Sequence, residues 1–270
     1  MALLRAAVLG VLMLGAGAAP ARAGTLLPER GGSPNADSIA SLYAIVLALA
    51  AVVFLGVVAA LVYSLARYRS SRSPVATQIH GNTRLEIAWT AAATILIVFI
   101  AVLSLSRLSS IEHPGPASAS EMTAAAKAGV GPAQHGTLHI KVLGRQYIWM
   151  YRYPGGVYSF EEMVAPVGVT VKLDIVSMDV AHSWWIPKLG GKFDAIPGLV
   201  NHTWFRIEKP GVYRGQCGEL CGRNHANMIA QVRGVPPAAY ARWIERQRQL
   251  ISGANVAGAR ERQQLLSGKQ

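Results

Sequence analysis

The sequence predicts a membrane-anchored all-β protein, in which a hairpin of two transmembrane helices precedes a β-sandwich or barrel. Two runs in the first half of the chain, 39–65 and 87–106, carry no charged residue. Each is long enough to span a bilayer, which requires about 20 apolar residues. From residue 137 onward, short alternating stretches are separated by Gly and Pro, which is typical of a sandwich or barrel.

The first 23 residues predict a secretory signal peptide. Arg5 precedes an apolar run, 6–14, and an Ala-Arg-Ala cleavage site stands at 21–23. A third transmembrane helix is the alternative, but the uncharged stretch is short for that and rich in Ala and Gly. Residues 24–108 are then expected to form an N-terminal segment and the transmembrane hairpin.

The segment between the two expected spans predicts the orientation of the hairpin. It carries four arginines and has no acidic residue before Glu86, and basic loops of this kind stay in the cytoplasm. A multi-pass protein of the cell membrane is therefore expected, with its C-terminal domain on the outer, periplasmic or extracellular, face. A buried helical hairpin of a soluble protein is the alternative, but two charge-free runs of this length argue against it.

The remaining chain divides by composition into three parts. Residues 109–136 are rich in Ala, Gly, Ser and Pro and predict a linker. Residues 137–235 are expected to form the β domain, and 236–270 a C-terminal helix with a loose polar tail after Gly253. Alternation predicts strands at 138–142, 157–160, 169–176, 204–207 and 228–232.

The formal net charge of +12 raises the question of a nucleic-acid partner. The basic residues are dispersed, and no RNA- or DNA-binding motif accompanies them. No nucleic-acid partner is therefore expected.

The only two cysteines, Cys217 and Cys221, stand in the stretch CGELCGRNHANM, 217–228. Two thiols, an imidazole and a thioether form a soft donor set, which favours copper or zinc over magnesium or calcium. A disulfide is one alternative in a secreted chain, but so short a loop gains little from a bridge, and His225 and Met228 would stay unexplained. Zinc is another alternative, but it has no use for a thioether.

The number of thiols bears on the kind of copper site. A mononuclear blue copper site takes one thiolate, two imidazoles and a weak axial Met, so this stretch holds one thiolate too many. Two bridging thiolates suit two copper ions that share one electron, and each ion then needs one imidazole. The loop supplies His225, and His182 in the stretch DVAHSWW, 179–185, is the candidate for the second.

Three motifs follow one another in the C-terminal half: HSW at 182–184, PKLGGKFDAIPG at 187–198 and CGELCGRNHANM at 217–228. In this order they closely resemble subunit II of the haem-copper oxygen reductases, the cytochrome c oxidase type. The resemblance implies a Greek-key cupredoxin-like domain that holds a binuclear copper (CuA) centre. It also implies the ligands of that centre: His182, Cys217, the backbone carbonyl of Glu219, Cys221, His225 and Met228.

The function that the resemblance implies is electron transfer within a proton-translocating oxidoreductase. A cytochrome c gives electrons to the copper centre, which passes them to haem in subunit I, where oxygen is reduced and protons are pumped. The implied partners are subunit I, the other oxidase subunits, cytochrome c and the membrane. Haem is expected only in the partner subunit, and the Glu219 carboxylate is expected to help hold Mg²⁺ at the interface with subunit I.

Other classes of protein fit the sequence less well. A quinol oxidase subunit II would lack the two cysteines, and a nitrous oxide reductase needs a large propeller domain that 270 residues cannot hold. A non-enzymatic copper carrier leaves the anchor hairpin and its EIAWT motif, 86–90, unexplained. The copper-containing subunit of a nitric oxide reductase stays open as the alternative, because the discriminating residues lie in the partner subunit.

The stretch LEIAWT, 85–90, also resembles the family at the start of its second helix. The family's Glu in this motif lies near the entrance of a proton path into subunit I, which implies that role for Glu86. The alternative is an ordinary carboxylate at a helix start, which the helix dipole favours.

The stretch GRQYIWMYRY, 144–153, contains the candidates for the place where the electron enters. The family has G-x-Q-W-x-W here, and its first Trp has this role. This chain has Tyr147 at that position and Trp149 two residues later. Either Tyr147 takes the role, or another exposed group does; for Trp149 core packing is the favoured interpretation, because aromatic side chains mostly bury.

The charge of the C-terminal part bears on the electron donor. After residue 108, 18 Lys and Arg stand against 11 Asp and Glu, so a basic cytochrome c would find little steering field. Asp179, Glu161 and Glu162 are candidates for a local acidic patch. An acidic or membrane-bound cytochrome is the alternative donor.

Overall fold

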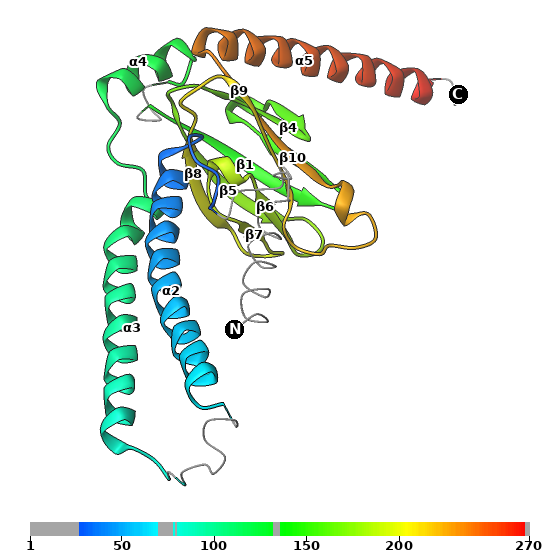
Figure 1. Cartoon of the computed structure of the whole chain (residues 1–270). Coiled ribbons are helices and arrows are strands. Elements are labelled where there is room, and N and C mark those ends of the chain that lie inside the picture. The colour runs from blue at the N-terminus through cyan, green and yellow to red at the C-terminus, as the bar shows by residue number, and fades with distance from the viewer. Residues whose placement is uncertain (1–26, 70–77, 79, 132–135, 268–270) are drawn as a thin grey trace, which may run out of the picture.

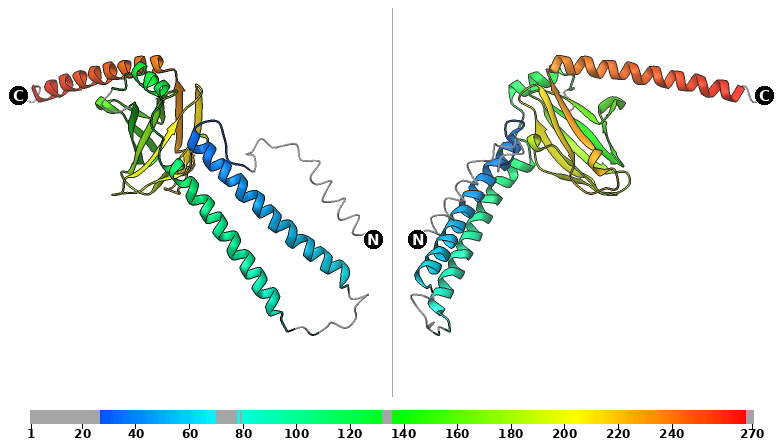
Figure 2. Two further views of the ribbon diagram at one scale, coloured as in Figure 1. Left: turned by 90° about the vertical axis from the view of Figure 1, so that its left-hand side faces the viewer. Right: turned by 45° about the vertical axis from the view of Figure 1, so that its right-hand side comes forward.

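The computed structural model describes residues 27–69, 78, 80–131 and 136–267. The expected signal peptide, 1–23, lies outside them. The described chain forms a helix hairpin, a β domain and a C-terminal helix (Figure 1). The hairpin extends from one edge of the β domain, and the C-terminal helix projects from the end of the domain that lies away from the hairpin (Figure 2).

The hairpin consists of α2 (Pro34–Arg67) and α3 (Thr83–Glu112), which lie side by side (Figure 2). Asn82 caps α3 by accepting a 3.1 Å hydrogen bond from the backbone N–H of Leu85. Both helices are long and apolar enough to cross a membrane, and in the most hydrophobic 18-residue stretch of each no residue is buried within this chain. The expected pair of transmembrane helices is confirmed, and both helices extend beyond the charge-free runs.

Two five-stranded sheets form the β domain. Sheet A has the order β3-β2-β1-β5-β8, with β1 (Thr137–Arg145), β2 (Ile148–Arg152), β3 (Tyr158–Phe160), β5 (Thr170–Ser177) and β8 (Asn201–Arg206). Sheet B has the order β4-β10-β9-β6-β7, with β4 (Glu162–Pro166), β6 (His182–Trp185), β7 (Phe193–Ala195), β9 (Gly211–Cys217) and β10 (Ile229–Val235). The pairs β1–β5 and β4–β10 are parallel, and the others are antiparallel. The expected cupredoxin-like sandwich is confirmed.

Burial explains which strands the sequence could predict. Along β1 the buried residues Leu138, Ile140 and Val142 alternate with exposed ones, so the strand shows the period of two that a half-buried strand requires. In β4 the last four side chains are all buried, because α5 packs on the same strand that also faces the core. A strand buried on both faces has no alternation to find, and the sequence did not predict β4.

The expected linker, 109–136, contains a helix and is therefore more than a linker. The helix α4 (Ala119–Lys127) begins with a capping box, in which the Ser118 side chain accepts from the backbone of Glu121 and the Glu121 side chain accepts from the backbone of Ser118. Ala125 and Val130 are buried in the domain core, and Glu121 forms an ion pair with Arg206. These contacts attach the segment to the β domain.

The C-terminal helix α5 (Pro237–Ser267) is longer than expected. Tyr240, Trp243 and Ile244 are buried against the domain, as the apolar pattern indicated. The helix does not end at Gly253 but continues to Ser267, so a loose tail after Gly253 was a wrong prediction.

Hydrogen bonds across distant segments hold the hairpin to the β domain. Asn35 at the start of α2 donates from Nδ2 to the carbonyl of Trp204 on β8 over 2.7 Å. Trp204 in turn donates from Nε1 to the carbonyl of Ile111 on α3 over 2.9 Å. Trp204 therefore contacts both helices, and Arg206 N–H also donates to Ser33 Oγ, just before α2, over 3.1 Å.

Candidate metal centre

The candidate ligands come from the start of one strand and the loop between two others. His182 begins β6, Cys217 ends β9, and the segment 218–228 leads into β10 through a short helical turn, η4 (His225–Asn227). The loop is closed at its base by a 2.9 Å hydrogen bond from Cys217 N–H to the carbonyl of Met228. Gly218 N–H donates to the carbonyl of Ser183 over 2.8 Å, which fastens the loop to β6.

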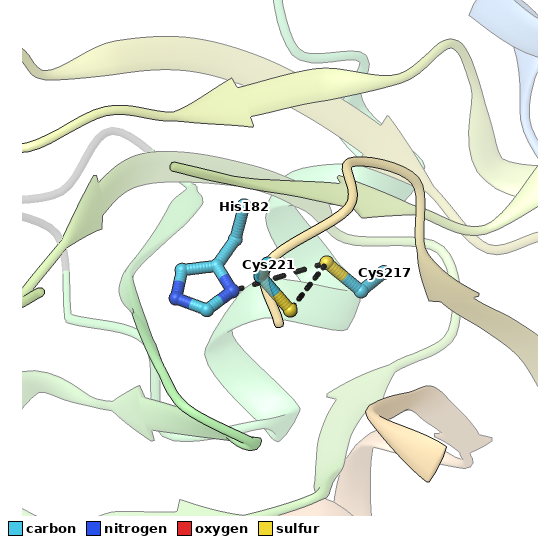
Figure 3. Close-up of side chains that lie close together, drawn as sticks. All are labelled: His182, Cys217 and Cys221. Atoms are coloured by element: carbon cyan, nitrogen blue, oxygen red, sulfur yellow. Dashed lines mark hydrogen bonds between the residues drawn. The ribbon is translucent and has the colours of Figure 1, made fainter. Parts of the chain in front are cut away.

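The two thiols and the first histidine meet in the interior of the domain (Figure 3). The Sγ atoms of Cys217 and Cys221 are 3.9 Å apart, well beyond the about 2 Å of a disulfide, and both cysteines are free. Sγ of Cys217 lies 3.9 Å from Nδ1 of His182. The three donor atoms lie within 4.8 Å of one another.

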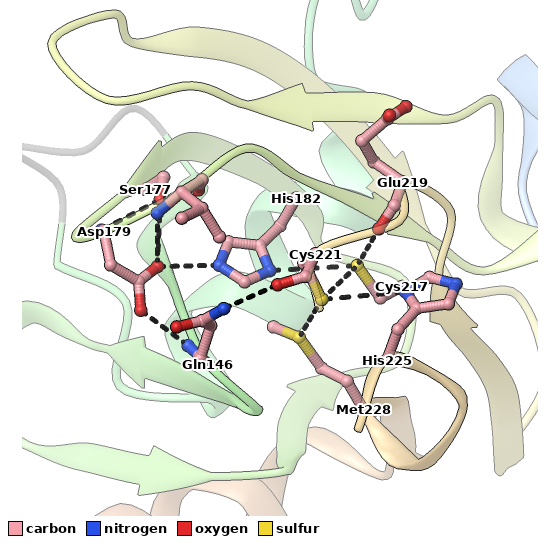
Figure 4. Close-up of polar contacts among 10 residues, drawn as sticks. Gln146, Ser177, Asp179, His182, Cys217, Glu219, Cys221, His225 and Met228 are labelled. Carbon is pink, nitrogen blue, oxygen red and sulfur yellow. Dashed lines mark hydrogen bonds and ion pairs between the residues drawn. The ribbon is translucent and has the colours of Figure 1, made fainter. Parts of the chain in front are cut away.

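The other three donor groups complete the cluster (Figure 4). The backbone oxygen of Glu219 lies 3.3 Å from Sγ of Cys217. Nδ1 of His225 and Sδ of Met228 lie 3.6 Å and 3.8 Å from Sγ of Cys221. Each thiol therefore faces the other thiol, one imidazole and one weak donor, which is the donor set that two copper ions bridged by two thiolates require.

Four of the donor residues are shielded from water, whereas His225 is partly exposed. His182 and Met228 are fully buried, and Cys217 and Cys221 are 1% and 3% exposed. Burial and the neighbouring Cys217 thiol raise the pKa of the Cys221 thiol to about 11. The thiol is therefore protonated at neutral pH in the metal-free chain, and a metal that binds the thiolate must displace the proton.

Asp179 supports the buried histidine from the opposite side. Its Oδ1 lies 2.8 Å from Nε2 of His182 and accepts a 2.7 Å hydrogen bond from Val180 N–H, and its Oδ2 accepts a 2.8 Å bond from Gln146 N–H. Partial burial acts to raise the pKa of Asp179, but the hydrogen bonds from Gln146, His182 and Val180 outweigh it, so the pKa lies below its usual value. An Nε2–H donated to this carboxylate leaves the Nδ1 lone pair directed at Cys217.

Two family models match this chain on either side of the central segment. Residues 21–107 match the transmembrane domain of cytochrome c oxidase subunit II, and residues 156–235 match its periplasmic domain. The chain belongs to the cytochrome c oxidase subunit II family.

Curated members of the family align with most of the chain. Cytochrome c oxidase subunit 2 of Cereibacter sphaeroides is 30% identical over 255 residues, which are 80% of this chain and 78% of that protein. The subunit 2 of Alkalihalophilus pseudofirmus is 37% identical over 188 residues, which are 67% of this chain. The match covers only 50% of the Alkalihalophilus protein.

Two solved structures align with part of the chain. The periplasmic domain of subunit II of the cytochrome oxidase of Bradyrhizobium japonicum is 36% identical, with a TM-score of 0.41 over 42% of this chain and 94% of that one. A haem-copper terminal oxidase dimer contains a chain that is 26% identical, with a TM-score of 0.39 over 56% of this chain and 99% of that one.

Tyr147, a candidate for the place where the electron enters, lies in the turn between β1 and β2. Its ring packs on the copper loop: a Cβ placed on Gly222 would lie 2.7 Å from Tyr147 Oη. Gly222 also has a φ of +134°, which side chains rarely adopt. The neighbouring Gln146 donates from Nε2 to the carbonyl of Cys221 over 2.6 Å. Tyr147 is half-buried and reaches the surface next to a candidate ligand.

Trp149 is a core residue, as favoured from the sequence. It is fully buried, and its ring lies edge-on to the ring of His182, with centroids 5.8 Å apart. The close approach needs Gly144, because a Cβ there would lie 2.9 Å from the Trp149 ring and 3.1 Å from His182. Trp149 therefore positions His182 by packing.

Glu86 lies apart from the candidate copper ligands, in the first turn of α3. This end of the hairpin points away from the β domain (Figure 1). The position suits the acidic residue that a helix N-terminus favours, and it also suits a place at the inner membrane surface. Its role in proton uptake stays a prediction.

Sequence reasoning did not assign Asp179 or Gln146 to the support of the ligands. Asp179 was considered only as a surface acid, although a carboxylate three residues before a ligand histidine is a signal for such support. Gln146 matches the Q of the G-x-Q-W-x-W pattern, but that match does not indicate its contact with Cys221, which is 75 residues away.

Proposed function

We propose that the chain is the electron-accepting subunit of a cytochrome c oxidase. It takes electrons from a cytochrome c at a CuA centre and passes them to haem in subunit I, for oxygen reduction coupled to proton pumping. The observation that carries the proposal is the convergence of two thiols, two imidazoles, a thioether and a carbonyl in one largely buried cluster. Membership in the subunit II family supports it.

The ligand roles follow from the contacts within the pocket. Cys217 and Cys221 would hold the copper pair as thiolates. His182 and His225 would bind copper through Nδ1, and Met228 and the Glu219 carbonyl would be the weaker ligands. The bound copper pair would supply a group that gains and loses one electron. The strands β6, β9 and β10 hold the donors in place, which keeps nuclear rearrangement small.

The surroundings of the pocket suggest roles for three further residues. The Glu219 side chain is exposed and points away from the thiols (Figure 4), so its carboxylate is free to help bind Mg²⁺ at the surface shared with subunit I. Tyr147 is the residue through which the electron enters, because its half-buried ring packs against Gly222, next to the candidate ligand Cys221. Glu86 lies near the entrance of a proton path into subunit I.

The anchor defines where this reaction takes place. The hairpin would cross the cell membrane twice, with the arginine-rich connection in the cytoplasm. The copper domain then stands on the outer face, where cytochrome c is found. Subunit I and the other oxidase subunits are the partners within the membrane.

Oxygen uptake by the purified complex tests the proposal. Reduced cytochrome c should drive oxygen consumption by the complex, and Cys217→Ser should abolish it while haem in subunit I still reacts with small reductants. Nitric oxide offered in place of oxygen distinguishes the alternative. Consumption of nitric oxide without consumption of oxygen would assign the chain to a nitric oxide reductase.

A further inference from the structure

The N-terminal segment, 29–36, which leads into and begins α2, packs on the loop between β6 and β7, 186–192. Gly32 lies directly against the backbone of this β6–β7 loop, because a Cβ placed on Gly32 would overlap the carbonyl group of Lys188. At the exposed edge of the contact, Glu29 pairs with Lys188 over 3.6 Å. The anchor hairpin therefore meets the β6–β7 loop as well as β8.

Asn35 joins the hairpin to the β domain from the interior of this contact. It is buried, and its Nδ2 donates to the carbonyl of Trp204 over 2.7 Å. Its Oδ1 accepts hydrogen bonds from the Ser33 hydroxyl and, over 2.8 Å, from Ala36 N–H. The side chain also lies against the β6–β7 loop, since a Cβ placed on Gly190 would be 2.9 Å from Nδ2. A buried polar group with hydrogen bonds at both its donor and its acceptor atoms favours one arrangement of the segments that it joins.

The β6–β7 loop contacts the chain on both sides of the candidate ligand Cys217. At the start of the loop, Ile186 lies against β9, where a Cβ placed on Gly215 would be 2.8 Å from the Ile186 Cα. At the end of the loop, the side chain of Lys192 covers Gly218, where a Cβ would be 2.9 Å from the Lys192 Cδ. The contacts lie two residues before Cys217 and one residue after it. A displacement of the loop would therefore displace this ligand.

The loop is also attached to the rest of the sandwich. Ile186 and Leu189 are buried in the core. The strand that follows the loop, β7, pairs with β6 so that Ala195 lies opposite the candidate ligand His182. The loop and the candidate ligands therefore form one unit, and a contact that places the loop on the hairpin places the metal centre as well.

We propose that Gly32 and Asn35 are positioning residues for the step in which the electron leaves the copper centre for subunit I. The inference rests on the proposed function, which makes subunit I the partner of the hairpin within the membrane. The two residues set how the metal centre lies relative to the hairpin, and the hairpin lies beside the subunit that holds the haem. Electron transfer slows steeply as the distance between donor and acceptor grows, so a small displacement of the copper centre lowers its rate.

The first measurement uses the purified oxidase complex with its copper and haem. A flash-activated cytochrome c gives one electron to the copper centre, and absorbance then follows reduction of the copper and its reoxidation by haem. Asn35→Ala should slow the reoxidation several-fold and leave the reduction unchanged, because the ligands and Tyr147 stay in place. Gly32→Ala should have the same effect, since the added methyl group pushes the hairpin and the loop apart. Copper content and the electron paramagnetic resonance spectrum should be unchanged in both variants.

Two matched variants serve as controls. Ser41→Ala also removes a side-chain hydrogen bond near the start of α2, but this bond runs only to the carbonyl of Asp37 in the same helix. Gly115→Ala also adds a methyl group beside the hairpin, but apart from its chain neighbours no described residue has an atom within 4 Å of the new Cβ. Neither control should change either rate.

The second measurement requires neither metal nor partner. Hydrogen–deuterium exchange of the metal-free full chain in detergent reports how firmly the β6–β7 loop is held. Asn35→Ala and Gly32→Ala should speed exchange in the loop and at the start of α2. Exchange in β4, at the opposite edge of sheet B, should stay as it is in the unchanged chain. The two controls should exchange like the unchanged chain throughout.

The outcomes separate this inference from the function on which it rests. Reoxidation of copper at the unchanged rate in both Asn35→Ala and Gly32→Ala would overturn the positioning role. Loss of copper, failure of the complex to assemble, or an equal slowing of copper reduction would also overturn it, because each would show a purely structural role. The proposed function would survive all of these results. It would be overturned if copper in the unchanged complex passed no electron to haem.

Discussion

Nε2 of His182 lies 2.8 Å from Oδ1 of Asp179, while Nδ1 of the same ring faces Sγ of Cys217 at 3.9 Å. The imidazole is thus held between a surface carboxylate and a buried thiol. A carboxylate in this position fixes the tautomer of the ring and increases its basicity as a ligand. The candidate ligand His182 is thus supported by the charge of Asp179 and by the packing of Trp149 against its ring.

We expect Asp179→Asn to lower copper affinity by about tenfold and to shift the reduction potential of the centre upward. The substitution removes the charge that raises the basicity of His182, and the less basic ligand favours the more reduced metal. Copper titration and redox titration measure the two effects. Asp194→Asn is the matched control, since Asp194 is exposed on β7. Unchanged affinity and potential in the Asp179 variant would mean that its contact with His182 is only structural.

Met228→Leu should keep both copper ions but shift the reduction potential, whereas Cys217→Ser and Cys221→Ser should damage or abolish the centre. A weak axial thioether tunes a copper site, while a bridging thiolate builds it. Variants of His182 and His225 should fall between these classes. Metal analysis with redox titration distinguishes them, and loss of both ions from the Met228 variant would contradict this ranking.

Tyr147→Trp should speed electron transfer from cytochrome c to the copper centre, and Tyr147→Ala should slow it, with copper content unchanged in both. A phenol has a smaller π-system than an indole, and its oxidation usually requires loss of the proton as well. Flash-induced reduction of the centre by a bound cytochrome measures the rate. If neither variant changes the rate at saturation, the electron does not enter at position 147, and an exposed edge such as His225 becomes the candidate.

Glu86→Gln should slow steady-state turnover of the complex while copper content stays intact. The motif LEIAWT places this carboxylate at the start of α3, at the end of the hairpin away from the copper domain. Loss of its charge would hinder proton uptake without reaching the ligands. Turnover equal to that of the unchanged complex would show that Glu86 only stabilises the N-terminus of α3.

The meeting of the six donor groups was predictable because most of them are close in sequence and because their motifs resemble those of a known family. Five of the six groups stand within twelve residues, 217–228, and soft donors at this spacing leave few alternatives. The two transmembrane spans were predictable for a similar reason, since a bilayer requires a long uncharged run and few other structures do.

Other features depend on contacts between distant parts of the chain. From the sequence alone, Glu162 is expected to be an unpaired acid on the surface. The parallel pairing of β4 with β10 instead places it beside Arg233. Ser118 and Glu121 have the spacing of a capping box, yet the surrounding Ala and Gly indicated a linker. Despite this composition, the burial of Ala125 against the domain stabilises α4 as a helix.

Copper stoichiometry and electron paramagnetic resonance of the copper-loaded full chain test the central claim most directly. The account predicts two copper ions per chain and a purple, mixed-valence centre, whose hyperfine pattern is that of one electron shared equally by two copper nuclei. One copper ion per chain, with the hyperfine pattern of a single nucleus, would contradict it.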